Sequence, residues 1–284
     1  MHLASLFLSR GLLRYFAGLV KTAREDERRH FEIFLFRATS AVLALDEMNF
    51  RIKHCLADAE AFREALTIKR PQIAFWAPDL FLLFHEFTPF LSAMRFLQDM
   101  LLPMIVRRLN LKISVPQSLN DAMNDLSVYG LPQPIEKLLV AYWSESGGDV
   151  RKYRVLDQHY FILCRHTFLE FEPKPRLVVY LPDDPSIQNE LKVTFERKID
   201  AVPYFANAFN AWHKCIELVS KEMGAKPAVL EEEMSMGHIG NLDAGVKQTL
   251  ALWLDEAEAS SAMEIGQTED RRVYCRKIDS KKKS

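Results

Sequence analysis

Apolar residues recur at helical spacing along most of the chain before residue 165. Phe31, Phe34, Leu35 and Ala38 follow an i, i+3, i+4, i+7 pattern, which places them on one face of a helix. The same spacing continues through residues 41–66. The pattern therefore predicts one long helix or two shorter helices across this region.

Prolines and glycines divide the chain after residue 66 into shorter segments. Pro71 and Pro78 mark a break before the most apolar stretch of the chain, and Gly130 and Pro132 mark another. Between and after these breaks, we expect helices at residues 80–109, 118–126, 135–143 and 150–165. The small and polar residues 144–148 predict a turn between the last two helices.

The spacing changes after residue 166. Residues 167–171, 176–181 and 190–199 are short segments rich in β-forming residues, which predicts three antiparallel strands. Residues 204–223 return to helical spacing and are followed by Gly224, a typical residue for a helix end. The predicted fold class is mainly α, a helical bundle with a small antiparallel three-stranded β element.

This order of elements predicts three regions. Residues 1–166 form the helical bundle, and residues 167–224 form the short strands with one packing helix. Residues 225–284 are polar and loosely composed, so we expect one loosely packed helix at 243–258 and a mobile tail after residue 259.

Composition narrows the class of protein. The chain has 284 residues, with 37 Lys and Arg against 38 Asp and Glu. This balance excludes a basic surface over the whole chain, although it leaves a local basic patch open. Gly and Pro are too scarce for a collagen-like or low-complexity protein. A chain of this length buries a sizeable core without disulfides or metals.

The cysteines favour a cytoplasmic protein with reduced thiols. They are widely and irregularly spaced, without a CxxC pair, which argues against a disulfide framework or a structural zinc site. The four are Cys55, Cys164, Cys215 and Cys275.

Two segments bear on targeting and membranes. The first 24 residues carry four basic residues and no acidic one, as do mitochondrial presequences and membrane-surface helices. An ordinary first helix with Leu13 and Phe16 on its core face is the interpretation we favour. Charged residues and two prolines interrupt the apolar stretch at 80–106, so no membrane span is expected.

One short motif indicates a chemistry. Residues 152–166 read KYRVLDQHYFILCRH, in which four residues separate Arg154 from His159 on a predicted helix. This spacing resembles the R-x4-6-H motif of the HEPN superfamily of helical-bundle proteins. Positions five residues apart lie about 140° apart around a helix. The two side chains therefore serve one site only where both line a groove, most simply at a dimer seam.

The resemblance implies a metal-independent ribonuclease or RNA-binding module of a toxin–antitoxin or defence system, working as a homodimer. Under it, Arg154 clamps phosphate and His159 is the general acid or base. The residue types suit that chemistry, because imidazole exchanges protons near neutral pH and a guanidinium holds two phosphate oxygens.

Neighbouring residues extend this hypothesis. Basic side chains that could form a rim for RNA are Arg151, Lys152, Arg165 and His166. Tyr153 and Tyr160 either stack on bases or pack inward on a helix face.

Glu27 and His30 have the E-x-x-H spacing of di-metal helical sites, but the chain has no second E-x-x-H. We interpret them as part of a surface charge cluster, and we expect neither a metal nor a cofactor. The alternative function is a non-catalytic helical scaffold, which binds a protein partner. The RNA hypothesis expects Arg154 and His159 at one exposed groove, whereas the scaffold hypothesis expects His159 buried or isolated.

Overall fold

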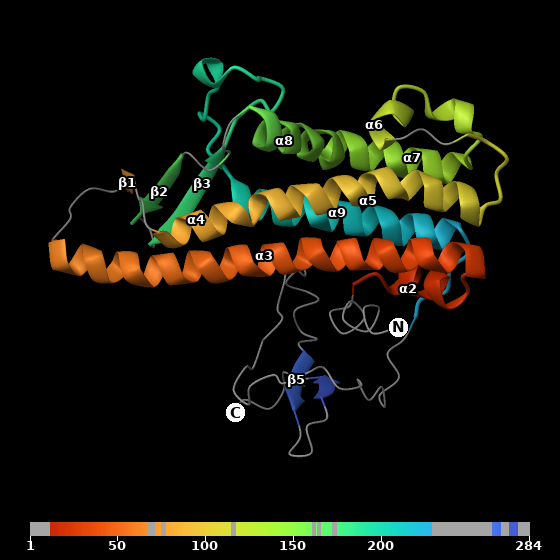
Figure 1. Ribbon diagram of the computed structural model, residues 1–284, viewed down its shortest axis with the longest axis horizontal. Helices are drawn as coiled ribbons and strands as arrows, with labels where there is room; N and C mark the ends of the chain where they lie inside the picture. Colours follow the sequence, from red (N-terminus) through yellow and green to blue (C-terminus); the bar gives the residue numbers. More distant parts are fainter. Residues whose placement is uncertain are drawn as a thin grey trace. The chain divides into compact units, whose positions relative to one another are not determined.

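The structure is a computed structural model that describes residues 12–66, 72–74, 78–114, 118–160, 163, 166–171, 175–228, 263–267 and 273–277. It confirms a mainly α fold with a small antiparallel sheet (Figure 1). The chain divides into two compact units. One consists of Phe36–Trp212, and the other combines Met1–Leu35 with His213–Ser284. The sequence interpretation, with divisions after residues 166 and 224, groups these segments differently.

Most of the helices belong wholly to the unit Phe36–Trp212. Those that do are α4 (Pro78–His85), α5 (Phe87–Arg108), α6 (Leu119–Ala122), α7 (Gln133–Tyr142) and α8 (Gly148–His159). The helices α3 (Glu25–Leu66) and α9 (Ala201–Glu222) contribute residues to both units. No helix in the described part of the chain is both long and apolar enough to cross a membrane.

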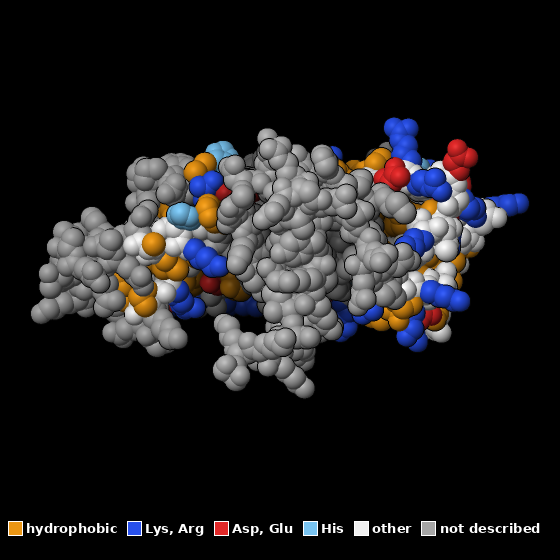
Figure 2. Space-filling model, turned by 90° about the horizontal axis from the view of Figure 1, so that it is seen from below, with side chains coloured by type: hydrophobic (Ala, Val, Ile, Leu, Met, Phe, Trp, Pro, Cys, Tyr) orange, Lys and Arg blue, Asp and Glu red, His pale blue; other side chains and the backbone are white. Residues whose placement is uncertain are grey.

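The helix α3 is one helix of 42 residues, rather than the two shorter helices that the sequence left open. Its buried side chains include Ala38, Leu45 and Met48, as the apolar spacing predicts. The opposite side carries Phe36, Leu43 and Phe50, each about half exposed and seven residues apart. On the face shown in Figure 2, apolar and basic side chains both reach the surface.

The core of the unit Phe36–Trp212 lies where aromatic residues of α5 and α9 meet. Phe205 on α9 packs against Phe87 and Phe90 on α5, with ring centroids 5.3 and 5.1 Å apart. Burial of such rings contributes to the free energy that holds the two helices together. Both α5 and α8 contribute further buried residues, and they lie side by side (Figure 1).

The antiparallel sheet has the strand order β1 (Gln72–Ala74), β2 (Thr167–Glu170), β3 (Arg176–Leu181) and β4 (Ile199–Asp200). The strands expected at 167–171 and 176–181 are present as β2 and β3. The strand expected at 190–199 is a 3-10 turn and a loop, of which only Ile199 joins the sheet.

The side chain of Asp183 explains that difference. Its carboxylate accepts hydrogen bonds from the Thr194 hydroxyl and from the backbone N–H groups of Glu196 and Arg197, at 2.8, 2.8 and 2.9 Å. A side chain that takes up backbone donors in this way competes with strand pairing. The segment therefore folds around Asp183 although its residue types alternate.

The region after residue 225 contains a strand pair that the sequence analysis did not predict. The strand β5 (Met263–Gln267) pairs antiparallel with β6 (Val273–Lys277). The helix predicted at 243–258 lies outside the described residues. Among the described side chains, Cys55 and Cys215 are buried and are not joined in a disulfide.

The other unit contains α2 (Arg14–Lys21), which a distant part of the chain caps. No local side chain caps the first turn of α2. Instead, the Glu217 carboxylate accepts the N–H groups of Tyr15 and Phe16, at 3.0 and 3.1 Å. The Nε2 atom of His213 accepts the N–H of Leu13 at 3.0 Å. These bonds satisfy donors that a helix start leaves unpaired.

The capping role of His213 predicts a pH dependence of stability. Burial lowers the pKa of His213 from 6.5 to about 4, so the ring is neutral in the folded protein and Nε2 is free to accept. As pH falls below 6.5, the His213 imidazole binds a proton in the unfolded chain but stays neutral in the folded chain. Stability that His213 contributes at pH 7 is therefore lost between pH 6.5 and about 4, by about 3 kcal/mol.

Urea unfolding of the wild type and of His213→Gln at intervals from pH 7.5 to 4.5 measures this loss. Glutamine keeps an acceptor without titrating, so the free energy of unfolding of the variant falls less with acidification. Burial raises the pKa of Glu217, which acts in the opposite direction but is common to both proteins. If the free energy of unfolding fell equally with pH in both proteins, His213 would not be the group responsible for the loss.

Candidate functional site

The helices α7 and α8 form one continuous helical rod with a π-helical segment, Trp143–Gly147, between them. Within it, the N–H of Gly148 donates to the carbonyl of Trp143, five residues earlier. The turn predicted at 144–148 is therefore a local widening of a helix and not a break. Residue size explains it, because a Cβ at Gly147 would lie 2.8 Å from the Tyr142 ring.

A buried glutamine on α5 holds the widened turn. The amide Nε2 of Gln98 donates to the Tyr142 hydroxyl at 2.8 Å and to the Gly147 carbonyl at 2.9 Å. Both hydrogen bonds are buried, and a buried polar group that loses its partner costs free energy. Gln98 thereby fixes the rotation and height of α8 relative to α5. Segments of π-helix of this kind occur frequently at functional sites.

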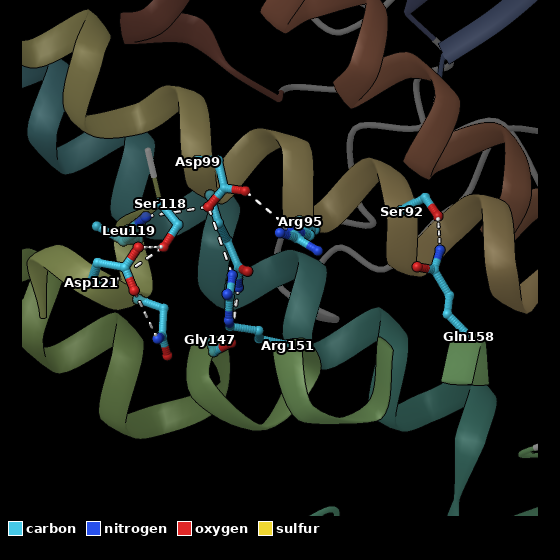
Figure 3. Close-up of polar contacts among 11 residues, drawn as sticks. Ser92, Arg95, Asp99, Ser118, Leu119, Asp121, Gly147, Arg151 and Gln158 are labelled. Atoms are coloured by element: carbon cyan, nitrogen blue, oxygen red, sulfur yellow. Dashed lines mark hydrogen bonds and ion pairs between the residues drawn. The ribbon is translucent and has the colours of Figure 1, made fainter. Parts of the chain in front are cut away.

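Beyond this point, α5 and α8 run antiparallel, and polar side chains of one helix lie opposite polar side chains of the other (Figure 3). We call each pair of opposite positions a rung and the whole row of them the seam. At one rung, the Asp99 carboxylate lies 3.9 Å from the Arg151 guanidinium. At another, the Gln158 amide donates to the Ser92 hydroxyl at 3.2 Å. Each of these rungs pairs groups that attract.

The rung between them pairs two cations. Arg154 follows Arg151 by three residues and precedes Gln158 by four, so the three share one face of α8. On α5, Arg95 occupies the matching position between Ser92 and Asp99 (Figure 3). Arg95 is the charge that acts most strongly on Arg154. Two positive charges therefore act on each other within a seam whose neighbouring contacts are complementary.

Arg154 has no counter-ion of its own among the described residues. Its Nε atom is buried without a hydrogen-bond partner, and the side chain makes neither a hydrogen bond nor an ion pair within the described part of the chain. Burial lowers the pKa of Arg154, and the neighbouring charges of Arg95 and Arg151 lower it further, while Asp99 opposes them. The guanidinium remains protonated at any physiological pH.

The carboxylate of Asp99, which lies near these groups, is shared among several donors. Asp99 lies 3.2 Å from the Nε of Arg95 and 3.9 Å from Arg151. It also accepts the backbone N–H of Leu119 at 3.2 Å. Asp99 is therefore paired with Arg95 and Arg151, and it acts on Arg154 less strongly than those two cations do.

The short helix α6 aims the Leu119 N–H at this carboxylate. Ser118 caps the helix by accepting the N–H of Asp121 at 3.2 Å, and its hydroxyl donates to the Asp121 carboxylate at 2.7 Å. Hydrogen bonds from Ser118 and Asn120 lower the pKa of Asp121. Its charge, however, lies in solvent, where water screens it.

The structure does not bring Arg154 and His159 together within one chain. His159 is the last residue of α8 and is exposed. Its ring contacts that of Tyr160, with centroids 6.5 Å apart, and no interaction joins it to Arg154 among the described residues. The angle of about 140° between their positions accounts for this.

Of the other predicted RNA contacts, Arg151 belongs to the seam, whereas Lys152 is exposed and pairs with Asp149 at 2.9 Å. The His166 ring stacks on Phe195, with centroids 3.7 Å apart. Arg165 lies outside the described residues.

The two tyrosines of the motif differ in their surroundings. Tyr153 is buried, and its hydroxyl donates to the Pro182 carbonyl at 2.6 Å, which matches an inward-packing role. Tyr160 is about half exposed, so its ring is accessible to a ligand.

Sequence reasoning missed the α5 half of the site. Gln98, Arg95 and Asp99 lie within the most apolar stretch, and we interpreted the charged residues there as evidence against a membrane span. A charge in such a stretch needs a partner, so these residues were a usable signal. The partner helix could not be identified before the fold was known.

Glu27 of the E-x-x-H pair has a structural role. Glu27 is buried rather than part of a surface cluster, and its carboxylate accepts the backbone N–H of Arg24 at 2.9 Å. It thus caps the start of α3. In the part of the chain that the structure describes, no group of three or more His, Cys, Asp or Glu side chains is placed to hold a metal ion.

Comparison with protein-family models, with curated proteins and with solved structures gave no match for this chain. Function is therefore inferred from the geometry of the seam between α5 and α8. That geometry can hold an anion, because it presents guanidinium donors that the described part of the protein leaves unpaired.

The role of Gln98 can be measured with a matched pair of variants. Gln98→Met keeps the side-chain length but leaves the Gly147 carbonyl and the Tyr142 hydroxyl without this donor. We expect the free energy of unfolding to fall by about 2–4 kcal/mol in urea titrations. Gln158→Met removes an exposed amide from the same seam, and its expected cost is below about 1 kcal/mol. Equal losses of unfolding free energy in the two variants would show that the buried hydrogen bonds of Gln98 contribute no more than the exposed one of Gln158.

Proposed function

We propose that this chain is an RNA-binding module that takes a phosphate group between Arg95 and Arg154. The observation that carries the proposal is the like-charged rung. Between two attractive contacts of α5 with α8, the positive charges of Arg95 and Arg154 act on each other. Like charges at such a position are destabilising unless an anion lies between them.

Phosphate suits the donors better than a halide or a single hydroxyl would. A guanidinium presents parallel N–H groups in a plane, which match two oxygens of a phosphate. Arg95 uses its Nε on Asp99, so its terminal amino groups can turn to a ligand. Arg154 retains its donors. The two side chains together can surround one phosphate with charge-assisted hydrogen bonds.

Two features favour RNA as the bearer of that phosphate. The spacing of Arg154 and His159 resembles the HEPN motif, whose active members cleave RNA. Tyr160 and His159, both exposed, follow Gln158 at the end of the same helix. Single-stranded RNA is commonly bound by basic groups on its backbone together with rings that stack on its bases.

Cleavage is the catalytic form of this proposal. It requires a second copy of the chain, since one chain holds His159 away from Arg154. In a homodimer that joins the ends of α8, the 2′-hydroxyl of the RNA would attack the adjacent phosphorus and the 5′ oxygen would leave, so that a cyclic phosphate forms. The His159 imidazole of the second copy would take the proton of the 2′-hydroxyl and return it to the 5′ oxygen, while Arg154 would stabilise the charge on the phosphate. Such a reaction needs no metal ion.

Binding of a fluorescent single-stranded RNA, followed by anisotropy in EDTA, tests the proposal. Arg154→Ala is expected to weaken binding about tenfold near 0.15 M salt and to lower the slope of log affinity against log salt by about one. Arg154→Lys keeps the charge without the planar fork and should fall between the wild type and Arg154→Ala. Arg29→Ala removes an exposed arginine of α3 and is the charge-matched control, with little expected change.

The same samples separate binding from catalysis. Loss of cleavage with retained binding in His159→Ala would support the catalytic form, with cyclic phosphate ends as the product. Equal weakening by Arg154→Ala and Arg29→Ala would contradict a specific site. A folded wild type that binds no RNA would favour the scaffold hypothesis, for which α3 offers the exposed side chains of Phe36, Leu43 and Phe50.

A further inference from the structure

The phosphate position between Arg95 and Arg154 is flanked on both sides along the helix axes. The Asp99–Arg151 ion pair lies on one side and the Ser92–Gln158 hydrogen bond on the other (Figure 3). These contacts join α5 to α8 directly. A ligand therefore has to enter the seam between two bridges, and a strand cannot run along the seam without breaking one of them.

The site is also recessed. The side chains of Arg151 and Asp99 are 19% and 22% exposed, and that of Arg95 is 33% exposed. The Nε of Arg154 has almost no contact with solvent. A ligand that bonds to all the guanidinium donors must therefore place its oxygens below the protein surface. A phosphate in the middle of an RNA strand contacts only the surface itself.

The charges nearest Arg154 favour the ligand with the greater negative charge. The guanidinium groups of Arg95 and Arg151 act on Arg154 together with one carboxylate, that of Asp99. Two further carboxylates belong to the surroundings, the exposed one of Asp121 and that of Asp157, which accepts the Thr88 hydroxyl across the seam. A terminal phosphate monoester carries close to two negative charges at neutral pH, whereas an internal phosphodiester carries one.

From these observations we infer that the site selects RNA ends that bear a terminal phosphate over internal phosphodiesters. This inference rests on the proposed function. A terminal phosphate leaves three oxygens free and is tied to the strand through one ester bond only. It can therefore enter between the two bridges while the rest of the strand stays outside. An internal phosphate has two free oxygens and two strand connections, and it cannot enter as deeply.

Competition binding with three versions of one RNA 12-mer tests the inference. One version carries a 5′-phosphate, one a 3′-phosphate, and one has hydroxyl groups at both ends. We expect at least one phosphorylated version to bind about tenfold more tightly than the hydroxyl version, as one additional charge-assisted contact set would give. Inorganic phosphate serves as a fourth competitor and reports whether the small anion alone occupies the site.

Variants assign the preference to the seam. Arg95→Gln and Arg154→Gln should each abolish the difference between phosphorylated and hydroxyl RNA, while Arg29→Gln should keep it. Circular dichroism shows whether each variant is folded, and Arg154→Lys provides a milder change that should reduce the preference without loss of fold.

The outcomes separate this inference from the proposed function. Equal affinity for all three RNAs, with weaker binding in Arg154→Gln, would overturn the end preference while the RNA-binding proposal remains. Inorganic phosphate that competes as strongly as phosphorylated RNA would also overturn it, since the site would then recognise the anion and not an RNA end. Absence of RNA binding altogether would overturn both.

Discussion

The buried amide of Gln98 determines how the two halves of the candidate site meet. It joins the Tyr142 hydroxyl and the Gly147 carbonyl from a position within the most apolar stretch of the chain. The carbonyl stands within the π-helical segment, whose glycine makes room for the Tyr142 ring. Together with the Asp99–Arg151 and Ser92–Gln158 contacts, the Gln98 amide fixes the positions of α8 opposite those of α5.

That constraint explains why the positive charges of Arg95 and Arg154 act on each other. Once Gln98 fixes α8 against α5, Arg151 falls opposite Asp99 and Gln158 opposite Ser92. Arg154 then has no position available except the one opposite Arg95. The attraction at the two outer rungs and the aromatic core stabilise a unit that contains a repulsive rung. Departures of this kind from local complementarity are expected at functional sites.

A desolvated guanidinium without a counter-ion costs free energy in the absence of ligand, and an anion that binds there removes this cost. The same anion must stabilise the folded protein, because the unfolded chain has no such site.

Much of the fold followed from the sequence because local signals agreed with the final structure. The spacing of Phe31, Phe34 and Leu35 placed α3, and Gly224, with a left-handed φ of 81°, ends the segment after α9. The prediction of secondary structure failed where contacts between residues distant in the sequence determined the local conformation. Residues 194–197 bond to the Asp183 carboxylate and do not form a strand. Gln98 and two glycines stabilise a π-helical segment where the sequence indicated a turn.

The candidate site could be predicted only in part for a related reason. Arg154 was visible as part of a motif in one helix, whereas Arg95 and Asp99 belong to a helix that the sequence separates from α8 by about forty residues. Only the packing of the two helices shows that their charges share one seam.

The buried Nε–H of Arg154 is, on this interpretation, the donor that a phosphate oxygen completes. The most direct test is the arginine side-chain region of a 15N NMR spectrum, with the Arg154 signal assigned by its loss in Arg154→Lys. Titration with the phosphorylated RNA 12-mer should shift that signal strongly downfield and slow its exchange with water, as a new charge-assisted hydrogen bond requires. An unchanged Arg154 signal at saturating RNA, with shifts elsewhere in the protein, would contradict the account.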